Sequence, residues 1–187
     1  MSEIRFNFSY NWSDHKLLEK WLAESVPAGG VVFEVASGPN ICTPWTLARL
    51  GRGARYIAIE LDWEHLLLQR ASLNGEPQLL VLGDGCKLPL ADESTDVAVF
   101  HHALDDIFET RGKPGVRQVV TEAARALKPG GYAIFSHCEL VGDEATFGID
   151  LDFAMQVGTD CGLVEVRRES AAAQDWLLVR KPEEVVS

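Results

Sequence analysis

The stretch that decides the fold is Val31–Asn40, which reads VVFEVASGPN. Its first part, Val31–Ala36, is an apolar run interrupted only by Glu34, and such a run between breakers is typical of a buried strand. The small residues that follow turn the chain. Thr43 and Pro44 are then a good cap and first-turn pair for a helix. A buried strand, a tight turn and a helix in this order indicate an α/β fold.

From this stretch outward, short apolar runs alternate with helical periodicity along the chain. Strands are expected over residues 31–36, 55–61, 78–82, 96–100, 132–137, 163–168 and 176–179. Helices are expected over residues 14–25, 44–50, 116–127 and 149–161, and in the segment that Asp62 caps. The last two strands are too close together for a parallel crossover, so they are expected to pair as an antiparallel hairpin. The predicted fold is α/β: a doubly wound, mostly parallel seven-stranded sheet with an antiparallel C-terminal strand and helices on both faces, in three α/β/α layers.

The length of the chain fits one domain. It has 187 residues, of which 47% are hydrophobic and 24% charged, values that are ordinary for a folded chain. We expect a single domain over residues 1–187, with an N-terminal lid and helix in residues 1–30 and the core in residues 31–181. The four cysteines lie far apart and no His cluster has zinc-ligand spacing, so no metal site is expected.

The charge balance argues against nucleic acid as a partner. The chain has 28 Asp and Glu residues against 17 Lys and Arg, which gives a net charge of −11, and its basic residues are scattered. Such a chain repels phosphate backbones. The amino terminus lacks the features of a secretory signal, and no apolar run approaches the roughly 18 residues of a membrane span. We therefore expect a cytoplasmic protein that does not bind a membrane.

Acidic residues lie at the ends of three successive predicted strands. Glu34 is near the end of the first strand, Glu60 ends the second, and Asp84 follows the third. Ligands of open α/β sheets bind beyond the carboxyl ends of the strands. Three carboxylates there suit a ligand that offers an ammonium group, a ribose diol and an adenine amino group. A dinucleotide site is a poor match, because the turn supplies only one of the three glycines of GxGxxG.

Together with these acids, three stretches of the chain resemble class I S-adenosylmethionine (SAM)-dependent methyltransferases. The first motif of that family is similar to VVFEVASGPN, the run into its fourth strand to LPLADESTDVAVFHHAL, and the turn into its fifth strand to ARALKPGGYAIF. The resemblance covers roughly residues 30–181. It implies a Rossmann-like core, SAM as the cofactor and methyl transfer as the activity. The first motif departs from the family pattern in that Ala36 and Asn40 replace glycines.

The resemblance also implies roles for individual residues. Glu34 and the backbone of the turn would hold the methionine part of SAM, Glu60 would bind the ribose hydroxyls, and Asp84 would bind the adenine amino group. Leu61 would pack against adenine. The implied cofactor-binding residues are Glu34, Ala36, Ser37, Gly38, Glu60, Leu61, Asp84, Gly85, Cys86 and His101.

Two histidines are candidate general bases. His102 follows the fourth strand and His137 ends the fifth, and a neutral histidine near pH 7 is able to remove a proton from an acceptor. For each of them, a structural or surface role is an equally good interpretation. The aromatic residues Tyr10 and Trp12 either fold over the cofactor as a lid or serve as plain packing residues.

The acceptor is expected to be a small molecule that receives the sulfonium methyl group of SAM by direct in-line transfer. No (D/N)PP(Y/F) run and no Pro-Cys pair follow the fourth strand, which argues against nucleic-acid bases and glutamine as acceptors. Only residues 1–13 and the expected loops 103–115 and 138–148 lie outside the sheet, so acceptor specificity must come from these segments or from a partner subunit.

Acidic residues are expected at the entrance to the crevice. Those concerned are Glu139, Asp143, Glu144, Asp105 and Asp106. A negative entrance favours neutral or amine-bearing acceptors and slows anionic ones. The alternative is that these acids are a solvated surface, and Asp105 and Asp106 are also suited to begin a helix.

Two other functions fit parts of the sequence. A non-catalytic SAM-binding module or subunit of the same fold would keep the cofactor residues, and the altered first motif leaves this alternative open. A nicotinamide-dependent oxidoreductase would also use Glu60 for its ribose, but the glycines and a Tyr-x-x-x-Lys pair are missing. The sequence is compatible with a homodimer and carries no signal of oligomeric state.

Overall fold

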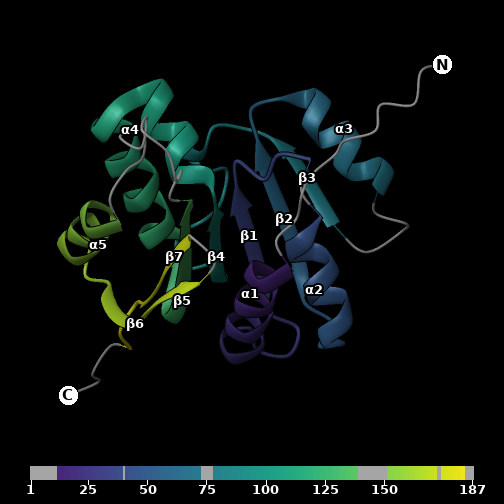
Figure 1. Ribbon diagram of the computed structural model, residues 1–187, viewed down its shortest axis with the longest axis horizontal. Coiled ribbons are helices and arrows are strands. Elements are labelled where there is room, and N and C mark those ends of the chain that lie inside the picture. Colours follow the sequence, from purple (N-terminus) through teal and green to yellow (C-terminus); the bar gives the residue numbers. More distant parts are fainter. Residues whose placement is uncertain (1–11, 40, 73–77, 139–150, 172–173, 184–187) are drawn as a thin grey trace.

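The computed structural model describes residues 12–39, 41–72, 78–138, 151–171 and 174–183, with the backbone alone for residues 12–15, 137–138 and 171. Within these ranges helices and strands alternate along the chain (Figure 1). The helices are α1 (Trp12–Ser25), α2 (Cys42–Leu50), α3 (Trp63–Ser72), the 3-10 helix η1 (Gly85–Lys87), α4 (Ala103–Ala126) and α5 (Leu151–Asp160). The strands are β1 (Val31–Val35), β2 (Arg55–Glu60), β3 (Gln78–Leu82), β4 (Thr95–His101), β5 (Leu127–Cys138), β6 (Val164–Ala171) and β7 (Gln174–Arg180).

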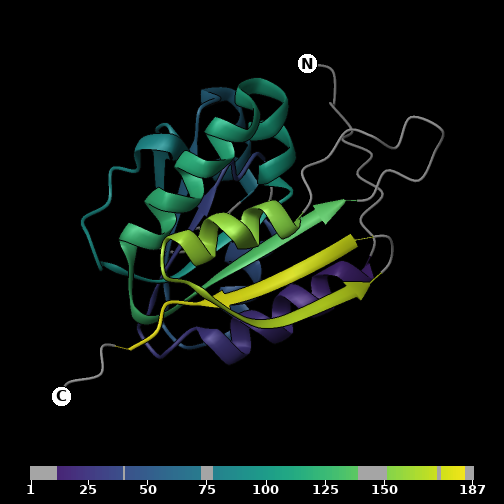
Figure 2. The ribbon, with the colours of Figure 1, turned by 90° about the vertical axis from the view of Figure 1, so that its left-hand side faces the viewer.

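The strands form one seven-stranded sheet in the order β3-β2-β1-β4-β5-β7-β6. Neighbouring strands are parallel except β7, which runs antiparallel to β5 and to β6. The predicted sheet with an antiparallel C-terminal strand is confirmed. Figure 2 shows β7 between β5 and β6, so β6 is the outermost strand on that side. The carboxyl ends of β1 to β5 therefore meet along one edge, where β7 begins.

The two faces of the sheet carry separate hydrophobic cores. Successive residues of β1 alternate between the faces, so Phe33 and Val35 pack with α4 and α5, while Val32 packs with α1 and α2. We call the core under α1 and α2 the second core; in it the rings of Trp21 and Trp176 meet edge to face, with centroids 5.9 Å apart. Figure 1 shows α4 and α5 on one side of the sheet and α1, α2 and α3 on the other. No helix in the described ranges is long and apolar enough to span a membrane.

Helix α4 covers a segment that the sequence predicts to be a loop. The breakers in residues 103–115 suggest irregular structure, but Ala103–Arg111 is helical. At Gly112, φ is 63° and ψ is −166°, so the helix breaks there and resumes. Pro114 is tolerated because it falls in the first turn of the resumed helix. The breakers therefore divide α4 into a first half (103–111) and a second half (113–126).

Two predicted helix caps have different outcomes. The side chain of Asp62 accepts a hydrogen bond from the N–H of Glu64 at 2.8 Å, which confirms Asp62 as the cap of α3. The prediction that Thr43 caps α2 is wrong, because Ile41 occupies the cap position and no side chain caps the helix. Thr43 lies inside the first turn and is fully buried against the sheet.

Candidate functional site

The turn after β1 is built from small residues in left-handed backbone conformations. The φ angle is 49° at Ala36 and 56° at Gly38. Glycine adopts this conformation freely, whereas a residue with a Cβ is strained by about 1–2 kcal/mol. Ser37 is 3% exposed, and its Oγ is buried without a hydrogen-bond partner in the described part of the chain. The turn is therefore a backbone surface that a polar ligand can approach closely.

Glu60 ties this turn to the end of β2. Its Oε2 accepts a hydrogen bond from the backbone N–H of Gly38 at 2.7 Å. Its Oε1 accepts hydrogen bonds from the N–H groups of Leu61 at 2.8 Å and Asp62 at 3.0 Å. A carboxylate offers about four acceptor positions, so about one position stays open on Glu60. Leu61 is 62% exposed and presents apolar surface beside this carboxylate.

Asp84 continues the same edge beyond β3. The N–H of Gly83 donates to the carbonyl oxygen of Glu60 at 2.9 Å, which joins the two strand ends. Asp84 Oδ1 accepts from the N–H of Cys86 at 2.9 Å, and Oδ2 accepts from Arg111 Nη1 at 2.9 Å. Burial alone would raise the pKa of Asp84, but these two hydrogen bonds and the charge of Arg111 outweigh burial and hold the pKa below its ordinary value.

Gly85 allows η1 to approach β1 closely. A Cβ at this position would lie 2.4 Å from Cγ1 of Val35 and 3.2 Å from Cγ2 of Val119. The first distance is far inside van der Waals contact, so this position requires glycine. The next residue, Cys86, is buried, and burial raises the pKa of its thiol, which favours the protonated form.

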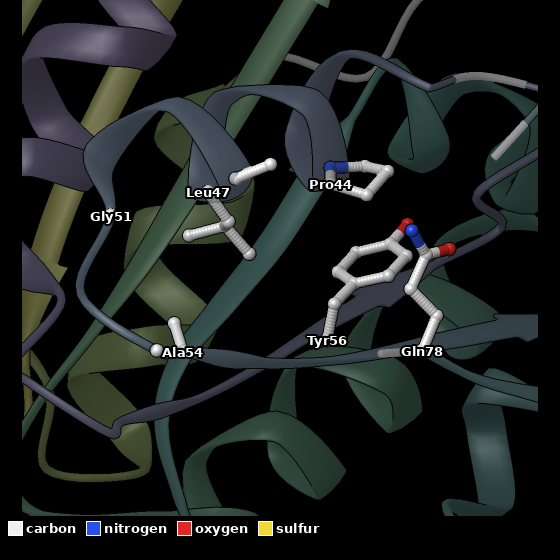
Figure 3. Close-up of a pocket in the computed structure, with 8 residues that line it drawn as sticks. Pro44, Leu47, Gly51, Ala54, Tyr56 and Gln78 are labelled. Carbon is white, nitrogen blue, oxygen red and sulfur yellow. The ribbon is translucent and has the colours of Figure 1, made fainter. Parts of the chain in front are cut away.

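Glu34 lies beneath the turn, in the second core. It is 0% exposed, and its Oε2 accepts a hydrogen bond from Tyr56 Oη, which in turn accepts one from Gln69 Nε2 at 3.3 Å. Burial raises the pKa of Glu34 to about 7, against the lowering effect of the Tyr56 hydrogen bond. Tyr56 also lines a pocket below α2, where Figure 3 shows its ring beside Gln78. The predicted contact of Glu34 with a cofactor stays a prediction.

Two pockets lie toward the opposite edge of the sheet from the acids. The pocket in Figure 3 has a volume of about 110 Å³, below the roughly 300–1,000 Å³ of ordinary ligand pockets. A larger groove of about 520 Å³ is lined by the first residues of four strands, which are Val31, Arg55, Gln78 and Thr95. Both pockets are therefore separate from the acidic residues at the carboxyl edge.

The ends of β4 and β5 and the start of β7 form the other half of the carboxyl edge. His101 ends β4, and its ring stacks on Trp176 with centroids 5.6 Å apart. His102 follows with φ of 60°, and its N–H donates to Ser136 Oγ at 3.2 Å. The Nε2 atom of His102 lies 3.3 Å from Nε2 of Gln174. Three neighbouring strands therefore fix the position of His102.

The first half of α4 lies close to Asp84 at the carboxyl edge of the sheet. Its last residue, Arg111, bonds Asp84, as described above. Burial raises the pKa of Asp106, and neighbouring carboxylates, among them Glu60, raise it further. Negative charge from α4 and from β2 therefore meets at this end of the sheet.

Comparison with known protein families identifies the family of this chain. The profile of the family described as methyltransferase domain matches residues 33–135, which is more than half of the chain. The chain belongs to the methyltransferase domain family. An uncharacterized methyltransferase of Mycobacterium bovis (strain BCG / Pasteur 1173P2) is 29% identical over 124 residues, which make up 65% of this chain and 45% of that protein. The matched region thus spans less than half the length of this curated relative.

Solved structures share the fold of this methyltransferase domain. A SAM-dependent methyltransferase from Aquifex aeolicus matches with a TM-score of 0.74 and 15% identity over 90% of each chain. A protein from Pyrococcus horikoshii OT3 matches with a TM-score of 0.72 and 17% identity over 91% of this chain and 90% of that chain. The predicted class I methyltransferase fold is confirmed.

The methyltransferase domain brings most of the predicted cofactor residues to one edge of the sheet. Those at or directly after the carboxyl ends of β1 to β4 are Ala36, Ser37, Gly38, Glu60, Leu61, Asp84, Gly85, Cys86 and His101. Their contacts with SAM stay predictions. Among the described residues, no group of three or more His, Cys, Asp or Glu is arranged to hold a metal ion.

Several predicted acceptor-side features lie outside the described residues. The entrance acids Glu139, Asp143 and Glu144, the lid residue Tyr10, and the side chains of Trp12 and His137 belong to this group. Asp105 and Asp106 lie in the first turn of α4, where the sequence allows them to begin a helix.

Three residues near the carboxyl edge of the sheet were not identified from the sequence. Arg111 and Gln174 act through partners distant in the chain, which no local pattern reveals. Trp63 is 58% exposed and follows the Glu60-Leu61-Asp62 stretch directly. The position of a tryptophan three residues after a predicted ribose ligand was the signal available in the sequence.

Proposed function

We propose that this methyltransferase domain binds SAM at the carboxyl ends of β1, β2 and β3 and transfers its methyl group to a small-molecule acceptor. The observation that carries the proposal is the junction of Glu60 with the turn after β1, because it joins the two predicted binding elements in one hydrogen-bonded unit. Membership in the methyltransferase domain family supports the reaction class.

The chemistry of the residues fits SAM. The cofactor offers an adenine amino group and ribose hydroxyls as donors, and Glu60 and Asp84 have acceptor positions left beside their protein partners. The exposed side chain of Leu61 suits the flat face of adenine. The unpartnered Ser37 hydroxyl and the small turn suit the polar methionine end.

The contribution of the chain is positioning. When bound, SAM supplies a methyl group activated by its sulfonium centre. The residues of β1 to β3 hold and orient the donor, while His102 and, by prediction, His137 lie on the acceptor half of the edge. Alignment of two reactants in a site that excludes water accounts for much of the rate in such a transfer.

The acceptor is proposed to be uncharged or amine-bearing. Asp105 and Asp106 lie in the first turn of α4, and the pKa of Asp106 is raised first by burial and then by the neighbouring carboxylates of Glu109, Asp105 and Glu60. A negative potential repels anionic acceptors and attracts cationic ones. We expect the enzyme to work in the cytoplasm. A homodimer is compatible with the sequence, and size-exclusion chromatography would test it.

The proposal is tested first by binding. Isothermal titration of the full chain with SAM and with its demethylated product should give saturable binding that Glu60→Ala weakens at least tenfold. Absence of binding in the folded wild type would overturn the assignment.

Turnover separates an enzyme from a non-catalytic binding module of the same fold. The protein is incubated with SAM and a broad metabolite pool, and methylated products are sought by mass spectrometry. SAM-dependent products that Asp84→Ala reduces support the enzyme. Binding without any turnover, including with a partner extract added, would favour the non-catalytic alternative.

A further inference from the structure

The two outer strands of the sheet differ in how they are protected against pairing with another chain. The charged residues of β6 are Glu165, Arg167, Arg168 and Glu169. Charges of this kind discourage the addition of a further strand at an exposed edge. β3 forms the opposite edge (Figure 1), and its sequence Gln78–Leu82 (QLLVL) carries no charge. Of the two edges, β3 is therefore the one that accepts another strand.

Apolar side chains of β3 are left in contact with water. The connection from β3 to β4 contains the short η1 and no longer helix. The face of β3 that carries Leu79 is therefore bordered by the groove of about 520 Å³, which Leu79 and Ile57 line together. Leu79 is 56% exposed and Leu82 is 60% exposed. A strand added at this edge would remove apolar surface of both side chains from water, which is favourable.

The free backbone groups of β3 form a symmetric set. The N–H of Gly83 points toward β2, because it donates to the carbonyl oxygen of Glu60. Backbone groups alternate in direction along a strand, so the N–H and C=O groups of Gln78, Leu80 and Leu82 point away from β2. Leu80 is the middle residue of this set. Two antiparallel copies of β3 centred on Leu80 therefore satisfy all of these groups in both strands.

The charges around β3 favour the antiparallel direction. The exposed Arg55 lies at the amino end of β2, whereas the carboxyl ends of β2 and β3 are followed or formed by Glu60, Asp62 and Asp84. An antiparallel copy brings the basic end of one chain beside the acidic end of the other, and a parallel copy would bring like charges together. The strands that meet are themselves uncharged, so the net charge of −11 on each chain is kept away from the contact.

We propose that the edge of β3 is an interface for a second copy of this chain, in which the two β3 strands pair antiparallel about Leu80 and join the two sheets into one. Leu79 of each chain then lies beside Val81 of its partner chain, on the side of the groove. The same surface is used by both chains, so the assembly closes at two copies. This inference does not depend on the function proposed above, because it concerns the outer edge of the sheet.

Sedimentation of the full chain in the analytical ultracentrifuge tests the interface. The wild type should be a dimer over a range of protein concentrations. Leu79→Lys and Leu79→Glu each place like charges near one another across the two-fold axis, so each alone should raise the dimer dissociation constant at least about tenfold. An equimolar mixture of the two variants should recover the dimer. Val166→Lys, at a 48% exposed position on the charged edge strand β6, is the matched control and should stay dimeric.

The direction of pairing is tested by reversal of one charge. Arg55→Glu places a carboxylate beside the acidic end of the partner chain, so it should weaken the dimer, and more strongly at low salt. Lys16→Glu makes the same change of charge at an exposed position of α1 and should leave the dimer unchanged. A dimer that is indifferent to Arg55→Glu would overturn the antiparallel arrangement.

Three results would overturn the interface itself. They are a folded wild type that is monomeric, a dimer that the folded Leu79 variants leave intact, and a dimer that Val166→Lys dissociates. Circular dichroism establishes that each variant is folded. Leu82→Lys, at the other exposed position of β3, takes the place of a Leu79 variant that does not fold.

Discussion

The carboxylate of Glu60, at the end of β2, accepts a hydrogen bond from the backbone N–H of Gly38 in the turn after β1, at 2.7 Å. The same carboxylate is the predicted ribose ligand. One side chain therefore shapes the turn and, by prediction, also binds the cofactor. Any change at Glu60 should affect the stability of the edge and the affinity for SAM together.

Replacement of Glu60 by alanine should lower both quantities. Three backbone N–H groups lose their acceptor, so the free energy of unfolding should fall by about 1–3 kcal/mol, and the affinity for SAM should fall at least about tenfold. Chemical denaturation and isothermal titration measure the two effects. Glu64→Ala, at an exposed position in the first turn of α3, is the matched control and should change stability by no more than about 0.5 kcal/mol. Normal stability and affinity in Glu60→Ala would contradict the role of the junction.

Glu34 should make the protein less stable as the pH rises from 4.5 to 7. Its pKa is about 7 in the folded chain, against an ordinary value of 4.5, so between these values the folded state keeps a proton that the unfolded state has released. The free energy of unfolding therefore falls across this window, by about 3 kcal/mol for a shift of this size, and is constant above pH 7 with respect to this group.

The Glu34→Gln variant removes this dependence and keeps an acceptor for Tyr56. Its advantage over the wild type should grow from pH 4.5 to pH 7 and then stay constant, as followed by denaturation at several pH values. Glu64→Gln serves as the control for loss of an exposed carboxylate. Parallel curves for wild type and Glu34→Gln would show that Glu34 titrates at an ordinary pKa.

The ion pair of Asp84 with Arg111 should compete with the cofactor. Each side chain is more than a third exposed, so the pair contributes at most about 1 kcal/mol to stability. Arg111→Ala removes a hydrogen bond from the carboxylate that the adenine amino group is predicted to use. SAM should therefore bind about two- to fivefold more tightly to Arg111→Ala, whereas Asp84→Asn should weaken binding. Weaker binding to Arg111→Ala would mean that the guanidinium itself holds the ligand.

A side chain at Gly85 should destabilise the fold through a collision with β1. Gly85→Ala places a Cβ 2.4 Å from Cγ1 of Val35, and overpacking of this kind costs about 1–3 kcal/mol. The cost should shrink when Val35→Ala removes that methyl group. Denaturation of both single variants and the double variant yields the coupling energy. Strictly additive effects would exclude the collision as the cause.

The strands and the edge that carries the site were predictable because they depend on local patterns. Short apolar runs between breakers mark β1 to β4, and parallel topology then brings Glu60 and Asp84 to the same edge. The first half of α4 was not predictable by this means, because Gly112 and Pro114 look like the end of a helix when they only divide one.

The side-chain contacts within the site could not be predicted from the sequence. Arg111 is 27 positions from Asp84, and Gln174 is 72 positions from His102, so these contacts exist only after the sheet has formed. Strand alternation places Glu34 on the face opposite Phe33. It does not predict that Tyr56 of β2 donates a hydrogen bond to Glu34 on that face.

The break in α4 has a consequence for redesign of this methyltransferase domain. The segment 103–111 is bounded by His102 and Gly112, both in left-handed conformations, so each end is a natural joint in the backbone. Beyond the break, Val116, Val119 and Val120 anchor the helix in the core. Libraries confined to the exposed positions of 103–111 should therefore alter which acceptors are accepted while the protein remains expressible and foldable, which makes this short segment an exchangeable cassette.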